Sequence, residues 1–169
     1  MKRLFCIVRG SSGLSGLNGS LSNIGYVQAS QMGRTLYHIL NDGEVVEVHT
    51  WTKIRCRETA WVMAADIVGE DECGQETLRK HVDMRINTHA EFSSINEELD
   101  QLLFIQQLIE KSEAENIMLI IDDPPSQLMR FFLLNGTQHD MYYGQGVLIT
   151  EEETIKIPLK TRVPLPPPR

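Results

Sequence analysis

The chain has 169 residues, of which 41% are hydrophobic and 23% charged, and this composition predicts one soluble domain with a substantial core. The net charge of −7 argues against a nucleic acid or an anionic membrane as partner, because both require a basic face. No segment reaches the roughly 20 apolar residues of a membrane span, and no signal-peptide pattern precedes the first strand, so we expect a cytoplasmic protein. The three cysteines lack C-x-x-C spacing, which predicts neither disulfides nor a metal site, and we expect no cofactor.

Strand and helix patterns alternate along the chain, which favours an α/β fold with a mainly parallel sheet. The expected elements, in chain order, are strand 4–8, helix 22–40, strand 44–48, helix 53–68, strand 84–87, a helix that opens at 94–97, strand 116–121, helix 126–134, and strands 146–150 and 154–159. In the third helix, Leu99, Leu102 and Ile105 belong to one apolar stripe that we expect in the core. The fourth helix is expected to begin with Asp123 as N-cap and Pro124 as its first residue.

A glycine-rich loop follows the first strand, with glycines at positions 10, 13, 16 and 19. Glycines let a loop approach a small ligand closely, so this loop is a candidate binding element. Its spacing contains neither the Gly-Lys-Ser/Thr of a nucleotide P-loop nor the G-x-G-x-x-G of a dinucleotide loop. We therefore do not expect a nucleotide there.

The sequence predicts one domain followed by a short C-terminal tail. Residues 1–160 are expected to form a single domain, and residues 161–169 a proline-rich tail in an extended polyproline II conformation. Within the tail, Pro164–Arg169 matches a short SH3-ligand pattern, so an SH3-type partner and a plain flexible tail both stay open.

Three motifs in order resemble the histidine phosphatase superfamily, which includes phosphoglycerate mutase-like and SixA-like proteins. The first motif is Val8-Arg9-Gly10 followed by Leu21-Ser22-x-x-Gly25-x-x-Gln28-Ala29, where the family has a strand ending in Arg-His-Gly and a helix that opens with Leu-Thr-x-x-Gly-x-x-Gln-Ala. The second is Arg55-Cys56-Arg57-Glu58-Thr59-Ala60, and the third is the apolar strand 116–121 that ends in Asp122-Asp123.

The resemblance implies the family's fold, a mainly parallel central sheet with helices on both faces in a phosphoglycerate mutase-like three-layer sandwich. It also implies a site at the strand ends, where Arg9 and Arg55 match the family's two phosphate-binding arginines. The family's two catalytic histidines are replaced by Gly10 and Asp123. Glycine offers no nucleophile, so covalent phosphoryl transfer through that position is excluded.

These departures suggest a vestigial phosphate pocket made by Arg9, Gly10, Ser11, Ser12, Arg55 and Asp123. Two arrangements stay open: the arginines bind an anion, or they pair internally with Asp123 and Asp122. The leading hypothesis is an inactive phosphatase-like domain with a regulatory or scaffolding role, which binds a protein partner or a small phosphorylated or anionic ligand. The alternative is a phosphohydrolase whose catalytic residues have moved to Ser11, Ser12 or His49.

Overall fold

The computed structural model of the protein describes residues 2–12, 19–69, 80–90, 97–133 and 140–158. Its elements, in chain order, are β1 (Arg3–Val8), α1 (Asn23–Ile39), β2 (Val45–Trp51), α2 (Ile54–Val68), β3 (Asp83–His89), α3 (Glu98–Lys111), β4 (Asn116–Ile121), α4 (Gln127–Leu133), β5 (Gly146–Ile149) and β6 (Thr154–Ile157). The middle of the glycine-rich loop (13–18), the capping residues 94–96 and the tail 161–169 lie outside the described residues.

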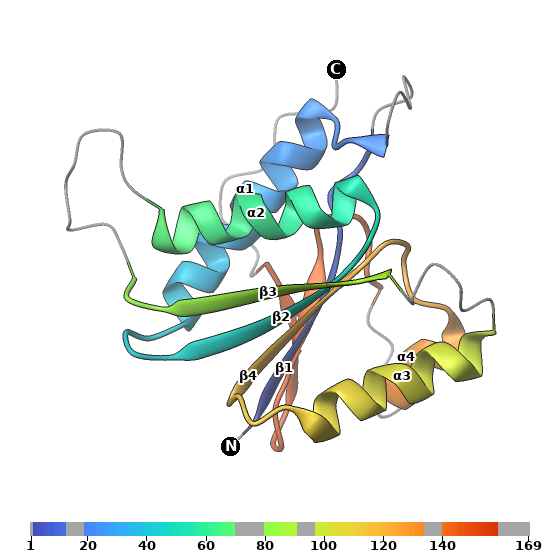
Figure 1. The fold of residues 1–169 in the computed structure, drawn as a ribbon. Coiled ribbons are helices and arrows are strands. Elements are labelled where there is room, and N and C mark those ends of the chain that lie inside the picture. The colour runs from blue at the N-terminus through green and yellow to red at the C-terminus, as the bar shows by residue number, and fades with distance from the viewer. Residues whose placement is uncertain (1, 13–18, 70–79, 91–96, 134–139, 159–169) are drawn as a thin grey trace.

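A six-stranded sheet in the order β3-β2-β4-β1-β5-β6 forms the centre of the molecule (Figure 1). The first four strands in this order are parallel, and β5 and β6 add antiparallel pairings at the other end. Helices α1 and α2 cover one face, while α3 and α4 lie on the opposite face (Figure 1). The expected fold class, a mostly parallel sheet with helices on both faces, is confirmed. None of the described helices is long and apolar enough to cross a membrane.

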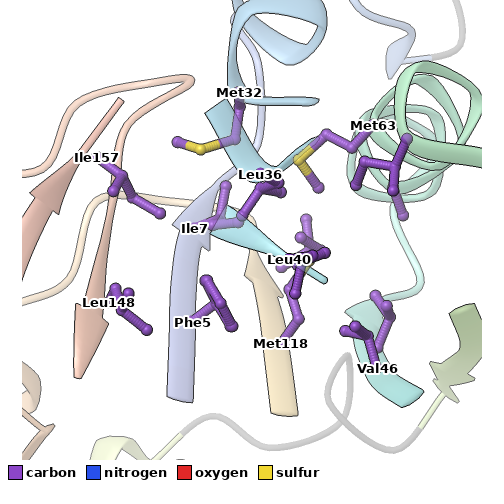
Figure 2. Close-up of a cluster of buried hydrophobic side chains, with 14 of the residues drawn as sticks. Phe5, Ile7, Met32, Leu36, Leu40, Val46, Met63, Met118, Leu148 and Ile157 are labelled. Atoms are coloured by element: carbon purple, nitrogen blue, oxygen red, sulfur yellow. The ribbon is translucent and has the colours of Figure 1, made fainter. Parts of the chain in front are cut away.

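The largest core cluster lies between the sheet and the α1–α2 layer (Figure 2). Each strand alternates its side chains between the two faces, so every second residue enters this layer. Phe5 and Ile7 of β1 and Met118 of β4 meet Leu36 of α1 and Met63 of α2, and all five are fully buried. Helix α1 begins at Asn23, after the N-cap Ser22, whose hydroxyl accepts a hydrogen bond of 3.0 Å from the Gly25 N–H.

Helix α4 begins within one residue of the expected range 126–134, but its N-cap is not Asp123. The helix begins at Gln127, and the Ser126 hydroxyl accepts a hydrogen bond of 3.2 Å from the Met129 N–H. Two consecutive prolines explain the difference, because each proline disfavours the helical conformation for the residue before it. Asp123 and Pro124 therefore cannot enter the helix, and the first available cap is the serine after Pro125.

The apolar stripe of α3 is narrower than expected. Leu102 and Ile105 are buried against Leu119 and Met129. Leu99 is 57% exposed and shares an exposed side of the helix with Leu103, one turn later. Two leucines of this helix are thus left to solvent, and the expectation for Leu99 is wrong.

The contrast between Leu36 and Leu99 gives a test of the packing. We expect Leu36→Ala to lower the free energy of unfolding by about 2–5 kcal/mol, because it leaves a cavity under α1. The matched control Leu99→Ala should change it by no more than about 0.5 kcal/mol. Urea unfolding followed by circular dichroism measures both, and an equal loss in the two variants would contradict this account of the core.

Candidate functional site

The candidate site lies where β1 and β4 end. These strands pair in parallel with Val8 opposite Ile121, so the residues that follow, Arg9 and Asp122, lie next to each other at one edge of the sheet. Arg55 comes from the first turn of α2, just after β2. Three segments far apart in the sequence thus bring two arginines and a carboxylate together.

Asp122 is the common partner of both arginines. The Arg55 guanidinium binds its carboxylate with two hydrogen bonds, from Nε to Oδ1 at 2.6 Å and from Nη2 to Oδ2 at 2.9 Å. Arg9 Nε donates to the Asp122 backbone carbonyl at 2.7 Å and to Oδ1 at 3.3 Å. The hydrogen bond from Arg55 to Asp122 raises the pKa of Arg55 above its ordinary value. Both guanidinium groups are therefore held by a charge-assisted internal network.

Arg9 is the more deeply placed arginine. It is 5% exposed, and its guanidinium carbon lies 4.1 Å from the centroid of the Tyr143 ring. It also donates to the Gly10 carbonyl at 3.0 Å. The planar guanidinium uses one edge for hydrogen bonds and one face for the aromatic ring, an arrangement that lysine cannot reproduce.

Asp123 was expected beside the arginines, but Asp122 takes that place. The Asp123 carboxylate is 73% exposed, and its Oδ1 lies 3.9 Å from Arg9 Nη2. The Asp122 carboxylate turns inward to both arginines, whereas the Asp123 carboxylate lies on the solvent side of Arg9. The internal pairing considered from the sequence therefore runs mainly through Asp122, and Asp123 stands at the rim.

Gly10 occupies the place expected for a catalytic histidine, and the backbone leaves no room there for any side chain. A Cβ at this position would lie 2.4 Å from the carbonyl oxygen of Gly25. The Gly10 N–H donates to the Thr59 hydroxyl at 3.0 Å, which fixes the peptide in this close contact. A histidine could enter only if α1 or the strand end shifted.

The two serines of the loop bond to polar groups that are not bases. The Ser11 hydroxyl lies 3.3 Å from the Ser22 hydroxyl, and the Ser11 N–H donates to Gln28 Oε1 at 2.9 Å. The Ser12 hydroxyl accepts from Arg9 at 3.5 Å. Among the described residues, no carboxylate or imidazole bonds to either hydroxyl.

His49 belongs to a different part of the molecule. Val46 and Val48 of β2 face the α1–α2 layer, so His49 faces the opposite side of the sheet. Its Nε2 lies 2.7 Å from a Glu47 carboxylate oxygen, and its Nδ1 lies 2.7 Å from His89 Nε2. The structure therefore does not bring His49 together with Ser11 or Ser12.

Several residues of the site were not singled out from the sequence. Thr59 and Gln28 were quoted in the motifs without a role, and the structure gives each a hydrogen bond to the loop backbone. Cys56 lies with its sulfur 3.9 Å from Asp122 Oδ1, and burial, together with that carboxylate, raises the pKa of the thiol to about 12. This cysteine is a neutral thiol at physiological pH and a poor nucleophile.

A cavity of about 410 Å³ adjoins the arginine network on the α3–α4 side. Its walls combine Trp51, Met129 and two prolines with Lys53 and the acidic side chains of Glu98, Asp122 and Asp123. The volume is that of a small-molecule site. Within the described ranges, no group of three or more histidine, cysteine or carboxylate side chains is arranged to hold a metal ion.

Comparison with known proteins identifies this architecture through structure alone. No family model and no curated protein matches the sequence. Among solved structures, the chain is similar to an Agrobacterium tumefaciens protein assigned as phosphohistidine phosphatase SixA, with a TM-score of 0.59 at 11% identity over 92% of this chain and 95% of that chain. The chain has a histidine phosphatase-like fold.

Two further structures support the assignment of the histidine phosphatase-like fold. An Escherichia coli K-12 protein assigned as an α-ribazole-5′-P phosphatase matches with a TM-score of 0.54 at 14% identity, over 95% of this chain and 97% of that chain. Phosphoglycerate mutase from Plasmodium falciparum matches with a TM-score of 0.50 at 15% identity, over 99% and 96% of the two chains. At such low identity the similarity concerns the fold, and the chemistry has to be argued from the residues.

The adjacent aspartates provide a matched test of the internal network. We expect Asp122→Asn to lower the free energy of unfolding by about 2–4 kcal/mol, because an amide offers one acceptor oxygen to two guanidinium groups that are largely removed from water. Asp123→Asn should change it by no more than about 0.5 kcal/mol, since that side chain is mostly exposed. Urea unfolding at neutral pH measures both variants. Equal effects would show that Asp122 does not have the central position described above.

Proposed function

We propose that this chain is a catalytically inactive histidine phosphatase-like domain that acts by binding. The observation that carries the proposal is the Asp122 carboxylate, which already occupies both arginines expected to bind a phosphate. A protein that must bind phosphate gains nothing from an internal anion in the same place. The arginines serve instead as the structural partner of a carboxylate that belongs to the chain.

Electrostatics support the proposal. Two unit charges 4 Å apart interact by roughly 4 kcal/mol at an effective dielectric near 20, so an incoming anion beside Asp122 meets a substantial repulsion. The positive charge of Arg9 and Arg55 is offset by Asp122 and, at the rim, by Asp123. Phosphate affinity at this position should therefore be low.

Among the residues that the structure describes, none beside the arginines is a suitable nucleophile, which also favours a binding role over the alternative, a phosphohydrolase with relocated catalytic residues. Gly10 has no side chain, and the neighbouring thiol of Cys56 has its pKa raised to about 12. A serine nucleophile requires a base within hydrogen-bond reach, and the described residues supply none to Ser11 or Ser12. A regulatory or scaffolding role through a protein partner or a small anionic ligand requires neither a nucleophile nor a base.

Turnover of p-nitrophenyl phosphate separates the two functions. We expect the wild-type protein to hydrolyse it no faster than the Arg9→Ala, Arg55→Ala double variant, with a SixA protein as positive control in the same assay. Circular dichroism checks that the variant is folded, and Arg55→Ala alone replaces it if it is not. Hydrolysis by the wild type that disappears when the arginines are removed would overturn the proposal.

Anion binding provides a second test with the same pair of aspartates. We expect Asp122→Asn to bind inorganic phosphate at least about tenfold more tightly than the wild type, because it removes a negative charge and frees guanidinium donors. Asp123→Asn should resemble the wild type. Isothermal titration calorimetry measures the affinities, and the gain should vanish in Asp122→Asn, Arg55→Ala. Equal or weaker binding by Asp122→Asn would mean that the carboxylate does not block an anion site.

A further inference from the structure

The cavity of about 410 Å³ beside the arginine network is built from the ends of several elements. Trp51 is the last residue of β2, Lys53 is the N-cap of α2, and Glu98 is the first residue of α3. The connection from β4 to α4 supplies Asp123 and two prolines, and Met129 of α4 completes the wall. The charged and apolar groups of this wall decide which ligand the cavity can accept.

The wall carries more negative than positive charge. Its acidic side chains are Glu98, Asp122 and Asp123, and its basic side chain is Lys53. Asp122 is held by both arginines, and Asp123 is mostly exposed, with Oδ1 3.9 Å from Arg9 Nη2. Lys53 is exposed, and a long lysine side chain can keep its ammonium group in solvent. Glu98 is therefore the carboxylate with most of its charge left for a ligand.

Glu98 has a carboxylate oxygen without a partner. Its Oε1 is removed from solvent and accepts no hydrogen bond within the described ranges. Buried polar atoms are nearly always hydrogen-bonded, so such an oxygen requires an explanation. The last torsion of a glutamate side chain is only loosely restrained, so the carboxylate can turn this oxygen toward a donor in the cavity. Water would supply the hydrogen bond alone, whereas an ammonium group would also compensate the charge.

The apolar part of the wall suits a ligand with an apolar stem. Met129 is buried, and Trp51 packs against two of the core clusters, so both side chains are held in place before a ligand arrives. A wall that is already ordered loses little conformational freedom on binding. Indole is also the aromatic group that attracts cations most strongly. Together, the carboxylate and this wall favour a cationic group with an apolar stem over a phosphate.

We propose that this cavity binds a primary ammonium group carried on an apolar stem. The ammonium group forms an ion pair with Glu98, Asp123 adds negative charge at the rim, and the stem packs against Trp51 and Met129. Such a group occurs on free aliphatic amines and on the lysine side chains of proteins. The inference goes beyond the proposed function and does not depend on it, because these residues are not the two arginines.

Isothermal titration calorimetry on the full chain tests the charge of the ligand. The probes are pentylammonium, 1-pentanol and pentanoate, which share a five-carbon stem and differ in charge. At constant ionic strength, we expect pentylammonium to bind with a dissociation constant on the order of 1 mM, and the other two probes at least about tenfold more weakly. Pentanoate binding as tightly as pentylammonium would overturn the proposal.

Matched charge variants test whether Glu98 is the ion-pair partner. Glu98→Gln should weaken pentylammonium binding at least about tenfold, because the amide keeps the shape of the side chain and removes its charge. Glu113→Gln is the control, since it removes the same charge from an exposed position just beyond the other end of α3, and it should bind like the wild type. Lys53→Gln should strengthen binding about twofold to fivefold by removing a positive charge from the wall. Circular dichroism checks that each variant is folded. Unchanged affinity in Glu98→Gln, or an equal loss in Glu113→Gln, would contradict the assignment of Glu98 and overturn the proposal.

The two tryptophans of the chain report where the amine binds. Trp51 lines this cavity, whereas Trp61 of α2 is 65% exposed and lines a different groove. We expect pentylammonium to shift the indole N–H signal of Trp51 in a proton–nitrogen correlation spectrum and to leave that of Trp61 unchanged. The variant Trp61→Phe assigns the two signals. A shift confined to Trp61 would place the amine elsewhere and overturn the proposal.

A further probe, Nα-acetyl-lysine methylamide, distinguishes the two sources of the ammonium group. Binding comparable to that of pentylammonium would support the proposal with a lysine side chain of a protein partner as the ligand. Binding of pentylammonium alone would support it with a free aliphatic amine. Failure of both amines to bind would overturn it. Turnover of p-nitrophenyl phosphate bears only on the proposed function, so the two proposals can fail separately.

Discussion

The organisation of the candidate site depends on one carboxylate, that of Asp122, and the two arginines that bind it. Arg9 leaves β1, Asp122 leaves β4 and Arg55 opens α2, so this network ties two neighbouring strands to a helix at the edge where the site lies. Charges removed from water must be compensated by partners. Arg9 also donates a hydrogen bond to the Gly10 carbonyl and contacts the Tyr143 ring. The same network therefore fixes the start of the loop and the segment that leads into β5.

The two departures from the expected phosphatase pattern support each other physically. At Gly10 the backbone approaches Gly25 so closely that a side chain has no space, and beside it Asp122 neutralises the arginines that the resemblance assigns to phosphate binding. Neither change alone explains the site. A histidine restored at position 10 would still face an occupied arginine pair, and a vacated arginine pair would still have no side chain beside it at position 10. A binding role is consistent with both changes at once.

Much of the architecture was predictable because it rests on local signals. Alternating strand and helix patterns gave the fold class, and the motifs gave Arg9, Gly10 and Arg55 their places near one another. The choice between Asp122 and Asp123 was not predictable, since it depends on which way a side chain points where β4 ends. The two prolines that follow keep Asp123 and Pro124 out of α4. This effect could be read from the sequence, but the Asp-Pro pattern of a helix start was given more weight, so the N-cap was predicted wrongly. The expectation that Leu99 is buried was wrong because helical periodicity locates an apolar stripe without defining its width.

The edge strand is connected to the rest of the molecule by more than its ladder with β2. His89 at the end of β3 lies 2.7 Å from His49, His49 lies 2.7 Å from Glu47, and the Ser112 hydroxyl after α3 donates to Glu47 at 2.9 Å. His49 and Ser112 are buried, so these hydrogen bonds form under α3 in a region of low water access. The network restrains β3 from the face of the sheet that α3 covers. One chain of hydrogen bonds thus joins the end of β3, the middle of β2 and the end of α3.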